Sequence, residues 1–313
     1  DFHPINDAEV MEALQADPLL YYISTYDRLA NELLNDRLQT GHWVSGRYAN
    51  NERYVTLDSD PQEATCFVLS TIMPPDENIL TTLLLSHTLK HHGATRVTAL
   101  LPYMAYMRQE REEDRHSKAT QWVGQITKAS GIDAIISVDV HSEEAVGVLG
   151  VPLIQLSPFM LFANQIEKIG WHTATLVAPD QGAVHRCEAV RDAGKFTTPI
   201  AYFEKKRTPD GVHSTLHGDV SRRAIVIDDI LDTGGTLIAC CTGLLEAGVE
   251  QIIVMVTHGL FTGDKWQQLW QMGVQTIYVT NTVPLPERLA NDNIRVLSIA
   301  PLLRDAIRDL SRL

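Results

Sequence analysis

The sequence predicts an α/β fold in which two similar domains each carry a mainly parallel sheet flanked by helices. Short apolar runs rich in β-branched residues alternate with helical patterns along the chain, which is the order that parallel sheets require. The 313 residues, 44% of them hydrophobic, suffice for one large or two medium domains. Strand–turn–helix units with acidic or proline-containing turns occur in both halves and indicate two similar domains.

The first half alternates strands with helices that have recognisable ends. Asp27 lies near the cap of one helix, Pro74–Asn78 precedes a second, and Gly93 ends it. We expect turns at 41–46 and a long exposed loop at 104–116, because the latter is charge-dense and has no apolar stripe. The predicted strands are 20–24, the second half of 47–57, 66–70, 96–101 and 134–140, and the predicted helices are 27–38, 79–92 and 120–130.

The second half repeats this order. After a turn at 179–183 a helix runs through Ala193, and 208–211 is expected to be an exposed turn. The predicted strands are 173–178, 200–203, 224–227, 251–256, 276–279 and 295–299; the other helices are 159–169, 237–247, one between 256 and 276, and 302–310. We expect residues 1–157 to form an N-terminal domain that the C-terminal helix 301–313 completes, and residues 158–300 to form the second domain.

Composition excludes several classes of partner. A formal net charge of −13 argues against a broad surface for nucleic acid or anionic membranes. No apolar run approaches the ~20 residues that span a bilayer, and the first residues show no signal-peptide pattern. The four cysteines have no metal-binding spacing, so we expect buried thiols in a cytoplasmic protein. Anionic substrates would have to meet local positive charge.

The most informative stretch is Arg223–Thr236. An apolar strand is followed by Asp228 and Asp229, then by Asp232-Thr233-Gly234-Gly235-Thr236 and a helix. Adjacent glycines at a helix start direct N–H groups toward one point, and the threonines add hydroxyl donors, which suits a phosphate. The carboxylate pair suits a sugar diol, so a sugar phosphate fits best. The Walker lysine is absent. The alternative is an ordinary crossing in which an Asp caps the helix.

Five further segments carry candidate residues. Asp139 and His141, two apart at a strand end, would face one side and could hold a divalent ion, although a structural histidine is the simpler interpretation. Asp180, at another strand end, could hold a second ion through water or simply cap a helix. Lys205 and Arg207, in a basic cluster, could stabilise a transferring phosphoryl group or be a solvated hairpin tip; Lys206 is the other possible register.

Arg108-Gln109 follows a strand in a segment that also contains Tyr103 and Tyr106. The arginine could clamp phosphates bidentately, with the tyrosines lining the approach. A solvated charge run explains the same pattern. Tyr48, Asn50 and Glu52 could stack on a base and bind its polar edge, although an ordinary strand entry would have the same sequence.

The stretch 223–236 resembles the phosphoribosyl-pyrophosphate loop of the type I phosphoribosyltransferase fold, which transferases share with ribose-phosphate pyrophosphokinases. Segments 102–114, 138–152 and 177–186 resemble the latter family's P-Y-x-x-Y-x-R-Q-D, D-L-H and S-P-D-x-G-G-x-x-R stretches. Lys205 and Arg207 match its K-x-R flap, and 47–52 resembles its R/K-F-S-N/D-x-E stretch. The chain therefore resembles the ribose-phosphate pyrophosphokinases. This resemblance implies two phosphoribosyltransferase-like domains.

The resemblance implies transfer of a pyrophosphoryl group from Mg-ATP to the C1 hydroxyl of ribose 5-phosphate. Residues 232–236 would hold the 5-phosphate, Asp228 and Asp229 the ribose hydroxyls, and Lys205 and Arg207 the transferring group. ATP would bind Arg108, Gln109 and the 48–52 stretch. The magnesium residues would be His141 and Asp180, with Asp139 beside them. A homo-oligomer, dimer or hexamer, is expected because the family's ATP site is shared between subunits.

Some positions depart from the family pattern. Gly150 replaces an Asp, Glu110 replaces another, and residues 112–118 lack the family's proline, which leaves regulation by phosphate or ADP open. Two alternatives remain at this stage. A phosphoribosyltransferase would leave Arg108-Gln109 and Lys205/Arg207 unexplained, and a non-catalytic regulatory homologue predicts damage to the flap or metal positions, which are intact.

Overall fold

The computed structural model describes residues 17–108, 117–141, 143–208, 211–290 and 293–311. The chain divides into two compact units, one formed by Asp1–Leu156 with Ala300–Leu313 and the other by Ser157–Ile299. Among the described residues, no helix has the length and apolar character that crossing a membrane requires.

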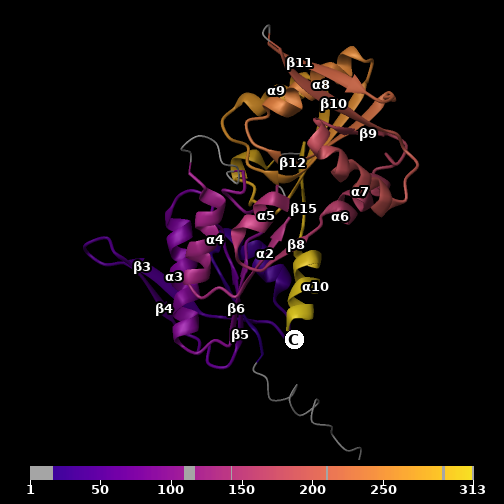
Figure 1. Ribbon diagram of the computed structural model, residues 1–313. Helices are drawn as coiled ribbons and strands as arrows, with labels where there is room; N and C mark the ends of the chain where they lie inside the picture. The colour runs from indigo at the N-terminus through magenta and orange to yellow at the C-terminus, as the bar shows by residue number, and fades with distance from the viewer. Residues whose placement is uncertain (1–16, 109–116, 142, 209–210, 291–292, 312–313) are drawn as a thin grey trace, which may run out of the picture. The chain divides into compact units, whose positions relative to one another are not determined.

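The first unit is built on a six-stranded parallel sheet in the order β2-β1-β5-β6-β7-β8. Its central strands are buried on both faces, as parallel sheets covered by helices are. Helices α3 and α4 lie on one side of the sheet and α2 and α10 on the other (Figure 1). The strands are β1 (Leu19–Tyr22), β2 (Gln39–Thr40), β5 (Thr65–Leu69), β6 (Arg96–Leu100), β7 (Ala134–Val138) and β8 (Leu153–Leu156). The helices are α2 (Asp27–Leu33), α3 (Glu77–His91), α4 (Ala119–Ala129), α5 (Glu143–Leu149) and α10 (Ala300–Leu310).

Two features are added to this sheet. A two-stranded antiparallel hairpin, β3 (Trp43–Arg47) with β4 (Arg53–Leu57), packs against α3 and extends from the unit in Figure 1. Helix α10 buries Leu303, Ile307 and Leu310, which share one helix face. It is joined to α2 by Arg304, whose Nη2 donates to the carbonyl oxygen of Glu32 at 2.8 Å.

The second unit has a seven-stranded sheet in the order β11-β10-β9-β12-β13-β14-β15, parallel except for the β10–β11 hairpin. One apolar core lies between the sheet and α6 with α7, and another lies between the sheet and α8 with α9. The strands are β9 (Thr175–Ala178), β10 (Ile200–Thr208), β11 (Gly211–His217), β12 (Arg223–Leu231), β13 (Gln251–Gly259), β14 (Val274–Thr280) and β15 (Ile294–Leu297). The helices are α6 (Phe159–Lys168), α7 (Val184–Gly194), α8 (Gly235–Glu246) and α9 (Gln268–Gln271), with short 3₁₀ turns η1 (Ser24–Tyr26), η2 (Gln181–Ala183), η3 (Lys265–Gln267) and η4 (Glu287–Leu289).

The fold class is confirmed, but several elements differ from the sequence prediction. Strand β12 does not end before the acid pair; it continues to Leu231, because Ile230 and Leu231 are buried and pair with β13. The predicted turn at 41–46 is largely strand β3, and helix 27–38 ends at Leu33. Strands β8 and β11 and helix α5 were not predicted.

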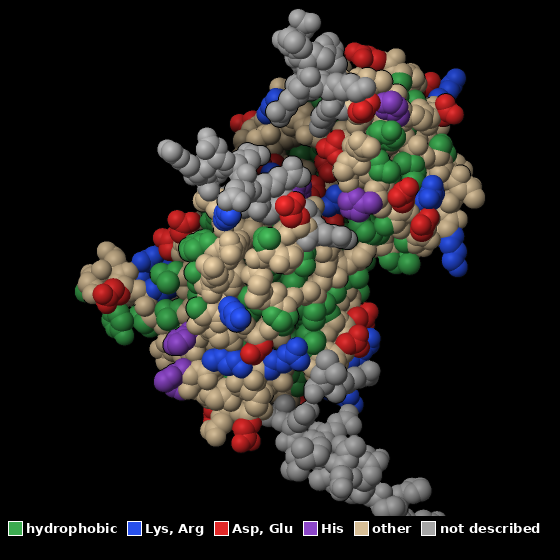
Figure 2. All heavy atoms as spheres, viewed as in Figure 1, with side chains coloured by type: hydrophobic (Ala, Val, Ile, Leu, Met, Phe, Trp, Pro, Cys, Tyr) green, Lys and Arg blue, Asp and Glu red, His purple; other side chains and the backbone are tan. Residues whose placement is uncertain are grey.

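The loop at 104–116 was predicted to be exposed, whereas most of its described part, residues 104–108, is buried. Met104, Ala105 and Met107 are buried in the core of the first unit, so this segment anchors itself with apolar side chains. Arg108 is exposed, and residues 109–116 lie outside the described residues. On the face shown in Figure 2, the basic groups are interspersed with acidic and apolar ones and form no broad basic surface among the described residues.

Candidate active site

Two adjacent carboxylates, Asp228 and Asp229, lie inside strand β12 and interact with one another. Asp229 is on the side of Ile225 and Ile227, which pack with α7, and it is only 6% exposed. There it meets Arg186 of α7, whose Nη2 lies 3.5 Å from its Oδ2. Both side chains are nearly buried, so the arginine offsets a charge that water cannot reach.

The pKa of Asp228 is raised well above its usual range. The first cause is burial, which disfavours the charged form; the neighbouring carboxylate of Asp229 comes next, and Asp180 adds a smaller effect. Its Oδ1 accepts a hydrogen bond from the Asp229 amide at 2.9 Å, which acts in the opposite direction. Burial and the neighbouring carboxylates thus disfavour the charged form of Asp228, and a hydroxyl donor or a cation placed against it would favour that form.

Asp180 joins this group because β9 and β12 are parallel neighbours. Val177 pairs with Val226, so the segments that follow run side by side. The Oδ1 atom of Asp180 caps the turn η2 by accepting from the Ala183 amide at 3.2 Å. Within the described residues, no group of three or more His, Cys, Asp or Glu side chains is arranged to hold a metal ion on its own. Any ion here would also need oxygen ligands from substrate or water.

The loop after β12 turns sharply into α8. Gly234 has φ +85°, a left-handed conformation that glycine adopts without strain, and Gly235 is the first residue of the helix. The first N–H groups of a helix have no intrahelical partner and attract anions. Thr233 is exposed and Thr236 partly exposed, so both hydroxyls are near this helix start and reachable from solvent.

A second loop holds this one in place. After β13, the amides of Leu260 and Phe261 donate to the Leu231 carbonyl at 2.8 and 3.1 Å, and the Thr262 amide donates to the Asp232 carbonyl at 3.1 Å. The buried Trp266 packs directly on Gly234, where a Cβ would come within 2.7 Å of the Trp266 Cα. We call residues 260–266 the bracing loop.

The predicted flap forms the hairpin of β10 and β11. Lys205 pairs with Ser214 and Arg207 with Val212 in the antiparallel register. The prediction of a short strand ending at Phe203 was wrong, because β10 continues through the basic cluster to Thr208. Residues 209–210 lie outside the described residues.

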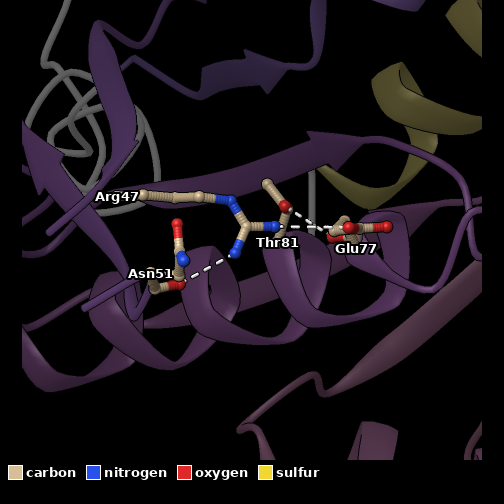
Figure 3. A network of polar contacts seen from close by, with 4 residues as sticks. All are labelled: Arg47, Asn51, Glu77 and Thr81. Carbon is tan, nitrogen blue, oxygen red and sulfur yellow. Dashed lines mark hydrogen bonds and ion pairs between the residues drawn. The ribbon is translucent and has the colours of Figure 1, made fainter. Parts of the chain in front are cut away.

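In the first unit, the 48–52 stretch is the tip of the β3–β4 hairpin. Figure 3 shows Arg47 extending to α3: its Nη1 donates to the Asn51 carbonyl at 2.8 Å, and its Nη2 lies 3.3 Å from Oε1 of Glu77. The Asn50 Oδ1 accepts from the Glu52 amide at 3.1 Å, which closes the turn. Tyr48 is 58% exposed, with Tyr54 beside it at 4.9 Å between ring centroids.

Asp139 and His141 do not share the face of a strand, and that part of the prediction was wrong. Strand β7 ends at Val138, and Asp139 has φ +45°, so the alternation of a strand no longer applies. Asp139 is buried, with its amide donating to the Leu156 carbonyl at 3.0 Å, whereas His141 is exposed. Gln109 lies outside the described residues. Tyr106 packs edge-on against Trp122 and against the core of the first unit. The ring that was predicted to line the approach to a phosphate site therefore also has a packing role.

Comparison with known proteins identifies the family. Residues 20–131 match the N-terminal domain of ribose phosphate pyrophosphokinase, and residues 182–312 match the phosphoribosyl synthetase-associated domain. The ribose-phosphate pyrophosphokinase of Pasteurella multocida is 31% identical over 283 residues, which cover 88% of this chain and 89% of the relative. This chain belongs to the ribose-phosphate pyrophosphokinase family.

Other relatives agree with this assignment. The ribose-phosphate pyrophosphokinase of Streptomyces avermitilis is 31% identical over 84% of this chain and 83% of its own length. The crystal structure of phosphoribosylpyrophosphate synthetase from Mycobacterium smegmatis superposes with a TM-score of 0.84 at 29% identity, covering 94% of this chain and 98% of that one. Both units thus have the fold of the ribose-phosphate pyrophosphokinase family.

Sequence reasoning did not identify two parts of this pyrophosphokinase-family site. Arg186 entered the sequence analysis only as part of the motif 177–186 and was given no role of its own. The carboxylates of Asp180, Asp228 and Asp229 in the same motifs were a signal for a buried cation near them. The bracing loop was missed because its contacts join segments about thirty residues apart, and only the parallel register of β12 and β13 brings them together. The available signal for this loop was a pair of aromatic residues, Phe261 and Trp266, in the segment that follows a buried strand.

Proposed function

We propose that this protein is a ribose-phosphate diphosphokinase, which transfers the pyrophosphoryl group of Mg-ATP to the C1 hydroxyl of ribose 5-phosphate and releases phosphoribosyl pyrophosphate and AMP. The observation that carries the proposal is the acid pair of β12 joined to the Gly234–Gly235 helix start, in a chain of this family. In this reaction a C1 oxygen bonds to the β-phosphorus, the α–β bridge breaks on the β side, and AMP leaves with the bridging oxygen. The C1 hydroxyl loses its proton.

The second unit would bind ribose 5-phosphate. The 5-phosphate would sit at Asp232–Thr236, where the helix start and the hydroxyls of Thr233 and Thr236 donate hydrogen bonds. Asp228 and Asp229 would accept hydrogen bonds from the ribose hydroxyls. A hydroxyl that donates to Asp228 would favour its charged form and so oppose the burial that raises its pKa.

The first unit would bind ATP. Tyr48 has an exposed ring available for stacking on the base, and Asn50 and Glu52 lie on the same fixed turn. The exposed Arg108 would contact phosphates, together with Gln109. These assignments follow the motifs at 47–52 and 102–114.

Magnesium fits the residues present. Asp180, Asp228 and Asp229 would supply hard carboxylate oxygens, with the remaining ligands coming from substrate and water, and Asp139 and His141 are candidates in the first unit. When bound, the ion neutralises phosphate charge and orients the pyrophosphoryl group. Lys205 and Arg207 would add positive charge as the transition state forms. Closure of the β10–β11 hairpin over the substrates would exclude water from the reaction.

Two further properties belong to the proposal. A homo-oligomer, dimer or hexamer, follows from the resemblance of the 47–52 stretch to a segment that serves a neighbouring subunit. A cytoplasmic location is supported by the four cysteines, which are all buried and form no disulfide.

The test is incubation of purified protein with ATP, ribose 5-phosphate and Mg²⁺, followed by phosphorus NMR and nucleotide chromatography. We expect AMP and phosphoribosyl pyrophosphate in equal amounts. Lys205→Ala should abolish the formation of both products. Lys168→Ala, which changes an exposed lysine of α6, should retain it. ADP as product would indicate a simple sugar kinase. Absence of turnover with substrate binding retained would indicate a regulatory homologue, and a screen of bases with phosphoribosyl pyrophosphate would test the transferase.

A further inference from the structure

The proposed phosphate site contains no cation of its own. Residues 232–236 include one aspartate and no basic residue, and Asp228 and Asp229 lie a few residues upstream in a chain with a net charge of −13. A phosphate held only by amides and hydroxyls beside Asp228 and Asp232 would feel the repulsion of their carboxylates. A positive group from another segment would therefore improve binding.

Lys265 is such a group. It is the first residue of η3, which packs on the start of α8. Its Nζ lies 3.8 Å from the position that a Cβ on Gly235 would occupy, and Gly235 is the first residue of α8. The ammonium group thus lies beside the first turn of the helix, where the free N–H groups converge, and a four-carbon stem lets it move by a few ångströms.

The backbone of Lys265 is held firmly by the bracing loop. Three amide hydrogen bonds tie residues 260–262 to the carbonyls of Leu231 and Asp232. Trp266, directly after the lysine, is buried against Gly234, and its Nε1 donates to the Gly263 carbonyl at 3.0 Å. Only the lysine side chain is left free to adjust, so little backbone order has to be gained on binding.

The charge of Lys265 is also unused in the structure. Its side chain is exposed and, among the described residues, pairs with no carboxylate. The neighbouring Asp264 is instead engaged by Gln267, whose Nε2 donates to its Oδ1 at 3.3 Å. A phosphate arriving at α8 would therefore not have to displace an existing ion pair.

We infer that Lys265 is a substrate-binding residue whose ammonium group contacts the phosphate of ribose 5-phosphate at the start of α8. The inference rests on the proposed function, since it names a further contact to the same substrate. Lysine binds phosphate as a point charge, so its contribution is charge rather than geometry. It acts on the ground state and the transition state alike, because the 5-phosphate is remote from the reacting C1 oxygen.

The test compares wild type with Lys265→Ala, Lys265→Gln and Lys265→Arg, and with Lys168→Ala as a matched exposed lysine of the same unit. Steady-state kinetics give KM and kcat for each substrate, and calorimetry gives the Kd of ribose 5-phosphate without ATP. We expect Ala and Gln to raise the KM and Kd for ribose 5-phosphate about tenfold. The kcat and the KM for ATP should change less than about twofold, which is the pattern of lost uniform binding.

Two controls make the outcome decisive. Arg should retain most of the affinity, and the affinity of wild type should fall more steeply with salt than that of Lys265→Ala. A Kd and KM within about twofold of wild type in Ala and Gln, or an equal loss in Lys168→Ala, would overturn the inference. Failure of wild type to make AMP would overturn the proposed function instead, and the Kd series would still decide the role of Lys265.

Discussion

At the scale of single residues, the acid pair of β12 combines a proposed binding role with a cost to stability. Asp229 is balanced by Arg186, whereas the pKa of Asp228 is raised by burial and by its acidic neighbours. The folded protein therefore retains a proton on Asp228 at pH values where the unfolded chain has released it. The stability contribution of this group falls as pH rises from the ordinary pKa of an aspartate toward the raised one.

Replacing Asp228 by Asn should stabilise the protein at neutral pH and abolish most of its activity. The amide carries no charge, so burial and the Asp229 carboxylate no longer penalise it. We expect Tm at pH 7 to rise by about 2–4 °C, the shift that ~1 kcal/mol gives in a domain of this size. Thermal melts from pH 4 to pH 8 should show a smaller decline with rising pH in the variant, and a variant less stable than wild type at pH 7 would contradict the argument.

Arg186→Met should be strongly destabilising, because it leaves the buried Asp229 without its cation beside two other carboxylates. Breaking a buried pair from one side costs about 3–5 kcal/mol, measurable by urea unfolding. The double variant Arg186→Met with Asp229→Asn should recover most of the loss. Arg222→Ala, which removes the exposed partner of Glu250, should cost less than about 1 kcal/mol. Equal losses of unfolding free energy in Arg186→Met and Arg222→Ala would contradict the prediction that the buried Arg186–Asp229 pair stabilises the fold more than an exposed pair does.

At the scale of elements, two helical glycines in the first unit should respond oppositely to alanine. In α4, a Cβ on Gly124 would lie 1.5 Å from the Leu149 carbonyl oxygen at the end of α5, so the two helices must separate. We expect Gly124→Ala to cost about 1–3 kcal/mol. Gly147, in α5, has nothing within 4 Å of its Cβ position, so alanine should gain about 0.5–1 kcal/mol of helix propensity. Chemical denaturation of both variants measures this, and a loss in Gly147→Ala would contradict it.

The elements also explain how far sequence reasoning reached. Apolar β-branched runs such as 66–70 and 224–227 predicted β5 and the start of β12, because buried parallel strands need little besides such residues. Strand β11 was missed since His213, Ser214 and Thr215 have no apolar alternation, and its pairing with β10 defines it instead. The end of β12 was placed too early because two aspartates are typical of loops.

The same limit applied to the candidate site. The glycine turn from β12 into α8, the proposed phosphate loop, could be predicted from the sequence because its residues are contiguous and Gly234 takes a positive φ at the helix start. Arg186 and the bracing loop could not, since their roles depend on neighbours across the sheet. Asp139 and His141 showed how one backbone angle can defeat a pattern: φ +45° at Asp139 ends the alternation on which their grouping relied.

At the scale of the whole molecule, the first unit is assembled from two distant parts of the chain. Helix α10 belongs to it, although residues 157–299 form the other unit. We expect Leu303→Ala, a fully buried change, to cost about 2–5 kcal/mol. Hydrogen exchange should then accelerate in α2 and β1 and remain unchanged in β13. Leu244→Ala in α8, equally buried, should give the reverse pattern, and a uniform acceleration in either variant would contradict two separate cores.

This discontinuity has a consequence for synthesis in the cell. A ribosome makes every residue of the second unit before it makes α10, so the second unit can finish folding while the first still lacks its last helix. During that interval, the α2 surface on which α10 later packs is uncovered and open to chaperones. A product released after residue 299 would therefore carry a complete second unit beside a first unit that lacks α10, which quality control can recognise.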